Sequence, residues 1–117
     1  MQADIDLKLR LRLMLNQSIA FGPGKADLLD AIQETGSISQ AAKKMQMSYR
    51  RAWQLVETMN QSFHSALVET HKGGESGGGA IVTPLGLEVL AQFRSMEQKA
   101  RSAIETETQQ LAQLLKR

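Results

Sequence analysis

Apolar and charged residues alternate at the start of the chain. In residues 5–15 every odd position is apolar, and the even positions are charged as far as Arg12. A period of two is typical of a strand with one buried face, so we expect a half-buried strand over this range. The next residues, 16–18, have the composition of a turn, and residues 19–21 are expected to form a short returning strand.

A helix is expected after the Gly-Pro-Gly sequence that follows. Leu28, Leu29 and Ile32 recur at helical spacing and predict a helix over about 25–35. Gly36 is placed to end this helix, because glycine adopts the left-handed conformation that closes many helices.

Two further helices are predicted to begin at serine caps. Ser37 and Gln40 match the capping box S-x-x-Q, which predicts a short helix over about 38–45. Ser48 is the expected N-cap of a longer helix that extends to about residue 63. The buried side of this helix is predicted from four apolar residues on one stripe: Ala52, Val56, Met59 and Phe63.

The remainder of the chain has the pattern of a hairpin followed by a long helix. Residues 67–70 and 80–82 are expected to form strands, and five glycines lie between them. Thr83 is a suitable N-cap, and Pro84 suits the first helical position. Neither proline nor glycine occurs after Leu87, so one helix is predicted over 84–117.

The long C-terminal helix carries an apolar stripe that a small domain cannot cover. A helix of about 30 residues spans roughly 45 Å, so we expect the stripe to pack on a second copy of the chain. Glu97 and Glu107 interrupt the stripe and favour a loose antiparallel crossing over a regular coiled coil. The expected dimerisation residues are Leu90, Phe93, Ala100, Ile104, Leu111 and Leu114.

Composition restricts the functions open to these 117 residues. Two histidines and no cysteine leave no convincing catalytic or metal-binding set, so we expect no enzyme, no cofactor and no metal site. No apolar run approaches the roughly 18 residues of a membrane span. The first residues lack the pattern of a signal peptide, and a cytoplasmic location with no membrane partner is expected.

Positive charge is concentrated in one segment, although the net charge is only +2. Residues 36–60 contain four basic residues against Glu57 alone, a local charge of 4 − 1 = +3. The order of helix, short helix, tight turn, longer helix and hairpin is the plan of a winged helix-turn-helix protein. Such a protein places its longer helix in the major groove of duplex DNA.

The candidate DNA-binding residues divide by expected partner. Arg50 and Gln54 lie one turn apart near the start of the recognition helix, and such side chains pair with guanine and adenine. Basic residues of the short helix and the hairpin are expected to meet phosphates, whereas Trp53 is expected to pack. The candidates are Ser37, Gln40, Lys43, Lys44, Ser48, Tyr49, Arg50, Arg51, Gln54, His71 and Lys72.

Several of these stretches resemble the N-terminal DNA-binding domain of the molybdate-responsive ModE regulators, which are relatives of the LysR-type helix-turn-helix. The matching segments include residues 36–42, 48–53 and 77–80, followed by Thr83-Pro84-Leu85-Gly86. The resemblance implies a homodimer on a pseudopalindromic operator, with the 48–54 helix and the 71–80 wing on DNA. ModE proteins continue into a molybdate-binding domain, whereas this chain ends at Arg117, so we expect no small-molecule effector to bind it.

The sequence therefore predicts a mainly α fold with a small β component. Residues 1–83 are expected to form a winged helix-turn-helix unit with an N-terminal strand, and residues 84–117 a long dimerisation helix of the same domain. The expected function is sequence-specific binding of double-stranded DNA by a homodimeric transcription regulator. The alternative is a winged-helix module that dimerises and binds protein; the polar face formed by Arg50, Arg51 and Gln54 favours DNA.

Overall fold

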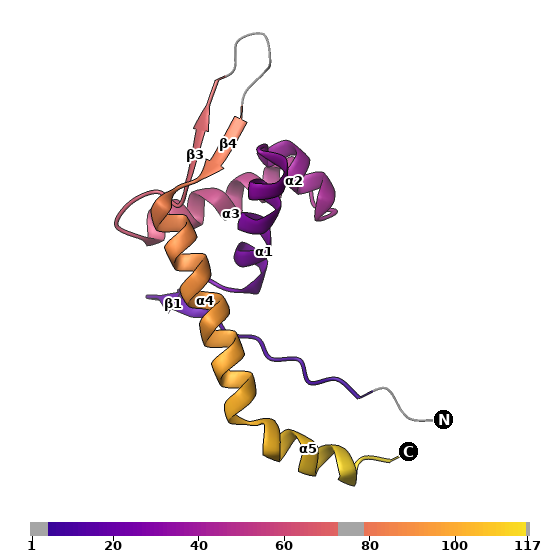
Figure 1. The fold of residues 1–117 in the computed structure, drawn as a ribbon. Coiled ribbons are helices and arrows are strands. Elements are labelled where there is room, and N and C mark those ends of the chain that lie inside the picture. Colours follow the sequence, from indigo (N-terminus) through magenta and orange to yellow (C-terminus); the bar gives the residue numbers. More distant parts are fainter. Residues whose placement is uncertain (1–4, 73–78, 117) are drawn as a thin grey trace.

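The fold is mainly helical, with two short antiparallel strand pairs, as expected from the sequence. The computed structural model describes residues 5–72 and 79–116. Helices α1, α2 and α3 pack together, the β3–β4 hairpin projects beside them, and α4 leads away to α5 (Figure 1). The elements in chain order are β1 (Leu13–Leu15), β2 (Ser18–Phe21), α1 (Pro23–Thr35), α2 (Ile38–Lys44), α3 (Tyr49–Ser62), β3 (Val68–His71), β4 (Gly79–Val82), α4 (Pro84–Ala103) and α5 (Glu105–Leu114).

The core lies between α1, α3 and the first half of α4. The apolar residues predicted to face inward on α1 are fully buried, as are Ala52, Val56 and Met59 of α3. Phe63 is half-buried and packs edge-to-face on Phe21, with the ring centroids 6.2 Å apart. The helical stripes read from the sequence are therefore the faces that build the core.

The predicted helix ends are largely confirmed. Gly36 closes α1 in the left-handed conformation (φ 69°). The Oγ atoms of Ser37 and Ser48 accept hydrogen bonds from the third residue of their helices, at 3.1 and 3.0 Å. The N–H of Ser37 donates to the Oγ1 of Thr35 at 3.3 Å, so the second half of the capping box comes from Thr35 and not from the Gln40 side chain.

The strand expected over residues 5–15 is much shorter in the structure. Only Leu13–Leu15 forms β1, which pairs antiparallel with β2 from Leu13↔Phe21 to Leu15↔Ser18. Residues 5–12 belong to no sheet. The reason is the short return strand, because β2 ends at Phe21 and the chain enters α1 at Pro23, which leaves the preceding residues without a partner.

The single helix expected over residues 84–117 is divided into α4 and α5. The break lies at Ile104, whose backbone leaves the helical region at φ −110° and ψ 14°. No helix-breaking residue occurs here, but the hydroxyl of Thr108 donates to the Ile104 carbonyl at 2.8 Å. Thr58 and Ser62 make the same hydrogen bond within α3, which is continuous, so this bond alone does not explain the break. Figure 1 shows α5 turning sharply away from the axis of α4.

An arginine cluster joins α4 to α1. The guanidinium of Arg94 donates to Asp27 at 2.9 Å, to Asp30 at 2.7 Å and to Glu97 at 3.0 Å. Burial lowers the pKa of Arg94, but the hydrogen bonds to the three carboxylates raise it by more, so the net shift is upward. The first half of α4 is thereby fixed against the helical core.

Two residues expected at a dimer interface belong to the core of the single chain. Leu90 and Phe93 of α4 are buried, and the Phe93 ring lies 5.1 Å from that of Phe21. Ala100 is half-buried, whereas Ile104, Leu111 and Leu114 are exposed. No helix within the described part of the chain is long and apolar enough to cross a membrane.

Candidate nucleic-acid interface

The outer face of α3 carries the polar residues that the sequence singled out. Tyr49, Arg50, Arg51 and Gln54 are all exposed; Arg50 and Gln54 lie opposite the buried stripe, Arg51 lies at the edge of that polar face and Tyr49 flanks the stripe. Tyr49 begins the helix, directly after the Ser48 cap. A positively charged patch therefore lies at the N-terminal end of the helix, where the backbone N–H groups also point outward.

A short turn and two buried alanines bring α3 close to α2. Ala41 and Ala42 are buried where the two helices meet, which allows a close approach. Gln46 adopts the left-handed conformation at φ 57°. Glycine adopts this conformation without steric cost. The side chain of Gln46 makes the turn strained but does not prevent it.

The β3–β4 hairpin is attached to the helices at two points. The N–H of Ala80 donates to the carbonyl of Gly36 at 2.9 Å, which anchors β4 at the corner between α1 and α2. The amide of Asn60 on α3 bonds the backbone of Leu67 and Val68 at the start of β3. The hairpin is thus held beside the helix-turn-helix at a defined position.

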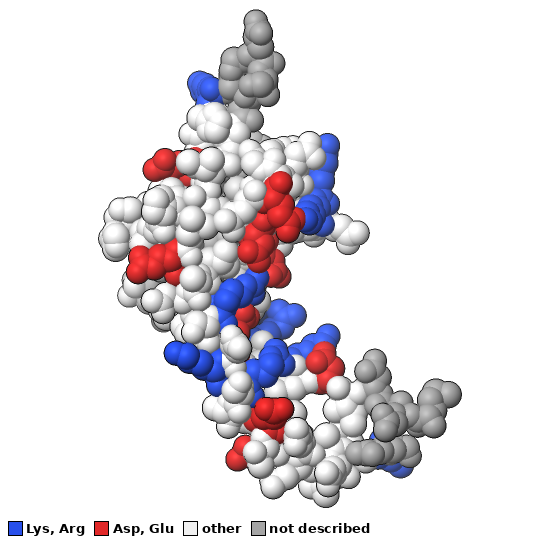
Figure 2. Space-filling view, viewed as in Figure 1, with Lys and Arg blue, Asp and Glu red and all other residues white. Residues whose placement is uncertain are grey.

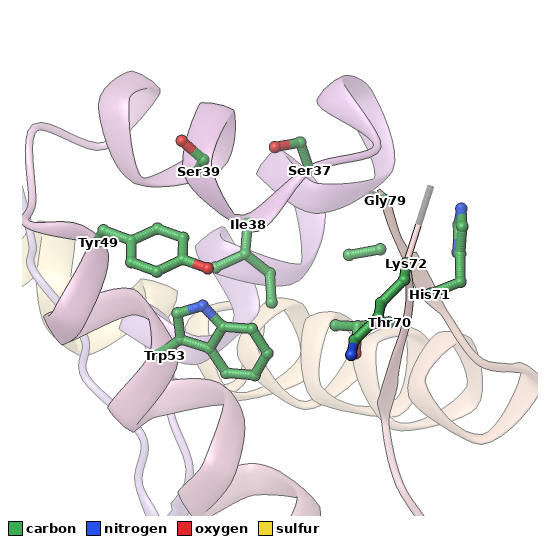
Figure 3. Close-up of a pocket in the computed structure, with 10 residues that line it drawn as sticks. Ser37, Ile38, Ser39, Tyr49, Trp53, Thr70, His71, Lys72 and Gly79 are labelled. Atoms are coloured by element: carbon green, nitrogen blue, oxygen red, sulfur yellow. The ribbon is translucent and has the colours of Figure 1, made fainter. Parts of the chain in front are cut away.

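A cleft of about 820 Å³ lies between α3 and the hairpin. Tyr49 and Trp53 project from α3 on one side of it, and the other side is formed by Thr70 and His71 of β3 together with the next residue, Lys72 (Figure 3). The first residues of α2 complete the lining, with Ser37 and Ser39 at the rim. Hydroxyl groups, a helix N-terminus and a lysine line one open cleft, and such groups suit a phosphate chain.

Trp53 has a place that the sequence interpretation missed. It is half-buried, stacks edge-to-face on Tyr49 with the ring centroids 6.1 Å apart, and lines the cleft. Trp53 packs, as expected from the sequence, and in addition forms part of the cleft lining. Its position one turn after Tyr49, at the border of the polar face, was the available signal.

The basic residues around the cleft differ in their surroundings. Lys43 is exposed in the last turn of α2, and Lys72 is exposed after the end of β3. Lys44 forms an ion pair with Glu34 of α1, so part of its charge is compensated within the chain. Figure 2 shows this basic group over α2 with acidic side chains next to it.

The imidazole of His71 packs over the opposite strand. A Cβ on Gly79 would lie 2.8 Å from the imidazole ring, so the glycine is what allows the ring to take this position. Residues 73–78 of the expected wing lie outside the described residues.

A buried lysine lies behind the polar face. Lys25 of α1 is almost fully buried, and its amino group donates to the carbonyl of Ile19. Burial lowers the pKa of this lysine, and the charge of Arg51 lowers it further. The Lys25 amino group is therefore close enough to Arg51 for the two charges to repel each other.

Three packed helices, a tight turn before the third and a hairpin beside it define a winged helix-turn-helix protein. The family description "Bacterial regulatory helix-turn-helix protein, lysR family" matches residues 25–87, more than half of the chain. The chain belongs to this family.

Its curated relatives include ModE regulators, which confirms the resemblance noted in the sequence. The chain is 44% identical over 72 residues to the "Molybdenum transport protein ModE" of Herbaspirillum seropedicae, a match covering 62% of the chain and 27% of the relative. It is 37% identical to the "Transcriptional regulator ModE" of Yersinia pestis, covering 98% of the chain and 43% of the relative. It is also 37% identical to the "DNA-binding transcriptional dual regulator ModE" of Escherichia coli K12, covering 90% and 38%.

The chain therefore spans less than half the length of these relatives. Among solved structures, ArgP from Mycobacterium tuberculosis superposes on 71% of the chain and 30% of its own length, with a TM-score of 0.48 and 20% sequence identity.

Proposed function

We propose that this chain binds duplex DNA sequence-specifically as a homodimer and regulates transcription. In this proposal the N-terminal half of α3 enters the major groove, which is about 12 Å wide, and the hairpin follows the backbone or the minor groove. The observation that carries the proposal is the cleft between α3 and the hairpin, with Arg50 and Gln54 exposed at the N-terminal end of the same helix. The family membership and the names of the relatives support it.

The residues divide into base readers and phosphate partners. Arg50 and Gln54 lie on the turns of α3 that reach deepest into the groove. Lys43 and Lys72 lie on the flanking elements, where phosphates are nearer. Lys44 is assigned a weaker role at phosphates, because its ion pair with Glu34 must open first.

The test is fluorescence anisotropy on an operator obtained by genome-wide selection of bound fragments, with a scrambled duplex beside it. Arg50→Ala or Gln54→Ala should cost about 1–3 kcal/mol on the operator and relax the preference at one base pair per half-site. Lys43→Ala or Lys72→Ala should weaken both duplexes alike and lower the salt slope by roughly one for each phosphate that is no longer neutralised. Lys99→Ala, which removes the same charge far along α4, is the matched control.

Trp53 provides an independent readout, because it is the only tryptophan in the chain and lines the cleft. Its emission should change on adding operator, and the change should persist in Lys99→Ala. If neither duplex binds below millimolar concentration at low salt, the DNA proposal fails and the alternative, a protein-interaction module, is favoured.

A further inference from the structure

The segment that was expected to be a strand but lies outside every sheet, residues 5–12, is here called the arm. From Asp6 onward its apolar and charged positions differ in exposure: Leu7, Leu9 and Leu11 are half-buried, whereas Asp6, Lys8 and the two arginines are exposed, as is Ile5 at the start. Figure 1 shows the arm crossing α4 next to β1 and then extending away from that helix, on the side to which α5 turns. The arm thus has the alternating exposure of a strand with one buried face, but no second strand pairs with it in the single chain.

The arm rests on the helices by one of its two backbone edges. The guanidinium of Arg101 on α4 donates to the carbonyl of Leu7 at 2.8 Å. Leu7 also lines a cleft of about 340 Å³ at the bend between α4 and α5. Within the described part of the chain, this is the single hydrogen bond found for the backbone of residues 5–10.

The other edge of the arm is open. In an extended chain the N–H and C=O of one residue point to the same edge, and those of the next residue to the opposite edge. Arg101 occupies the edge of Leu7, so the free edge presents the N–H and C=O groups of Asp6, Lys8 and Arg10. A row of unpaired backbone groups of this kind is a template for another strand.

We propose that the arms of two copies pair as an antiparallel two-stranded ribbon across the two-fold axis of the homodimer. This inference rests on the homodimer of the proposed function. The occupant is a second copy of the same segment, because a two-fold axis pairs each residue i with a residue j and j with i. The apolar faces of both strands then remain on one side of the ribbon, toward the α4 helices.

Charge selects the register of the ribbon. If the axis passes between the two Leu7 residues, Asp6 of each subunit lies opposite Lys8 of the partner subunit, and no like charges are opposed. Ile5 then lies opposite the partner's Leu9. An axis at Lys8 also gives two opposite-charge pairs, of Asp6 with the partner's Arg10, but it opposes the two Lys8 residues. An axis at Leu9 gives two pairs of Asp6 with the partner's Arg12, but it opposes Lys8 and the partner's Arg10 twice. Like charges directly opposite each other in a strand pair are destabilising, so the register centred on Leu7 is favoured.

The open edge agrees with this register. Pairing along the edge of Asp6 and Lys8 makes those two residues a hydrogen-bonded pair and makes Leu7 and the partner's Leu7 a non-hydrogen-bonded pair. The Cα atoms of such a pair are about 4.5 Å apart, which is within the range of about 4.4–6.8 Å that a disulfide spans.

The absence of cysteine from the chain allows a direct test. Leu7→Cys should form covalent dimers under mild oxidation, and these should revert to monomers on denaturing gels after reduction. Leu9→Cys is the matched control on the same face, because its two copies lie four residues apart along the ribbon, about 14 Å. A mixture of Ile5→Cys and Leu9→Cys proteins should cross-link more than either alone.

A charge exchange tests the same register without a cross-link. Asp6→Lys should raise the dimer dissociation constant by about twofold to thirtyfold, and adding Lys8→Asp should restore it by reversing the pair. The inference is overturned if Leu7→Cys and Leu9→Cys cross-link equally, or if only Leu9→Cys does so. It is also overturned if the double variant dimerises no better than Asp6→Lys.

Sedimentation and DNA anisotropy of the reduced Leu7→Cys protein separate this inference from the proposed function. If the Leu7→Cys protein is dimeric and binds operator when reduced, but does not cross-link when oxidised, the ribbon is excluded and the proposed function stands. If the wild-type protein is monomeric at tens of micromolar, the proposed homodimer is excluded as well.

Discussion

Gly86 marks the closest approach of α4 to the end of the hairpin. A Cβ at this position would lie 2.7 Å from the Cγ1 of Val82 and closer still to the carbonyl oxygen of Leu67. The N–H of Gly86 also donates to the Thr83 cap at 3.0 Å, so the backbone has little freedom to move away. The glycine is needed for space, since its φ is not in the left-handed range.

Gly86→Ala is therefore expected to reduce the free energy of unfolding by about 1–3 kcal/mol, as overpacking does. Urea unfolding followed by circular dichroism measures the effect. Gly24→Ala on α1 is the control, because no atom lies within 4 Å of its added Cβ, and it should gain up to about 1 kcal/mol through helix propensity. Equal behaviour of the two variants would contradict this account of Gly86.

Single residues with local partners were predictable from the sequence, and residues with distant partners were not. The serine caps and Gly36 act within three or four positions, so their roles follow from spacing alone. Lys25 was beyond prediction, because its burial depends on the Ile19 carbonyl of another element. Trp53 faces the hairpin, which comes later in the chain and meets it only in the folded state.

Between elements, Asn60 connects the recognition helix to the wing. Its Oδ1 accepts from the N–H groups of Leu67 at 2.8 Å and Val68 at 3.2 Å, and its Nδ2 donates to the Val68 carbonyl at 3.0 Å. Leu67 and Val68 are buried, so water cannot replace these bonds. An asparagine late in a helix thus sets where the hairpin begins.

Asn60→Ala is expected to cost about 2–4 kcal/mol, because it leaves buried backbone groups without partners. Asn60→Asp keeps the acceptor and loses the donor, and should fall between wild type and the alanine variant. Chemical denaturation of the three proteins gives the order. The exposed neighbour Gln61 is the control, with Gln61→Ala within about 0.5 kcal/mol of wild type. A small effect of Asn60→Ala would show that the wing is held elsewhere.

The elements that the sequence misjudged are those whose form depends on a partner. Helices α1 to α3 bury their stripes within the domain, and their predicted bounds agree with the structure to within about two residues. The segment 5–12 has the period of a strand but no neighbouring strand in the single chain. The break at Ile104 could not be predicted, because neither proline nor glycine occurs there and the apolar positions continue beyond it.

At the scale of the whole molecule, the chain is too extended for its length. Its radius of gyration is 17.5 Å and its longest dimension 59 Å, whereas a compact chain of this size has a radius of gyration of about 13 Å. The excess comes from the second half of α4 and from α5, which has no buried residue. Exposed apolar side chains occur there, with Ile104 38%, Leu111 65% and Leu114 81% exposed, and a second group lies on β1 and β2: Leu13, Met14, Leu15 and Ile19.

An extended shape with exposed apolar side chains is typical of a chain that associates with a second chain. Apolar side chains that lie away from the core of a monomer remain in contact with water. When two such surfaces associate they bury each other, which is favourable. Leu90 and Phe93 belong to the core of the chain, so only the distal part of the stripe remains exposed for the homodimer that is proposed above. The apolar stripe was predicted from the sequence. Which of its residues face the core of the chain and which remain exposed could not be predicted.

The combined substitution Ile104→Glu and Leu111→Glu is therefore expected to yield monomers. Four carboxylates per dimer would have to be buried where apolar side chains were, and unpaired buried charges are very costly. Sedimentation velocity at tens of micromolar measures the state of association, and circular dichroism checks that the helices remain. The control adds the same charge on the exposed polar positions Gln92 and Gln110, and this variant should stay dimeric.

Loss of the dimer should also separate two contributions to DNA affinity. A dimer binds its second half-site as an intramolecular event, which raises affinity by about 10²–10⁴ over a single half-site. The monomeric variant should lose this factor on a full operator and keep the wild-type affinity for an isolated half-site, because α3 and the hairpin are unchanged. Anisotropy with full and half operators distinguishes the two. A variant that stays dimeric, or one that loses half-site binding as well, would contradict the assignment of dimerisation to the distal part of α4 and α5.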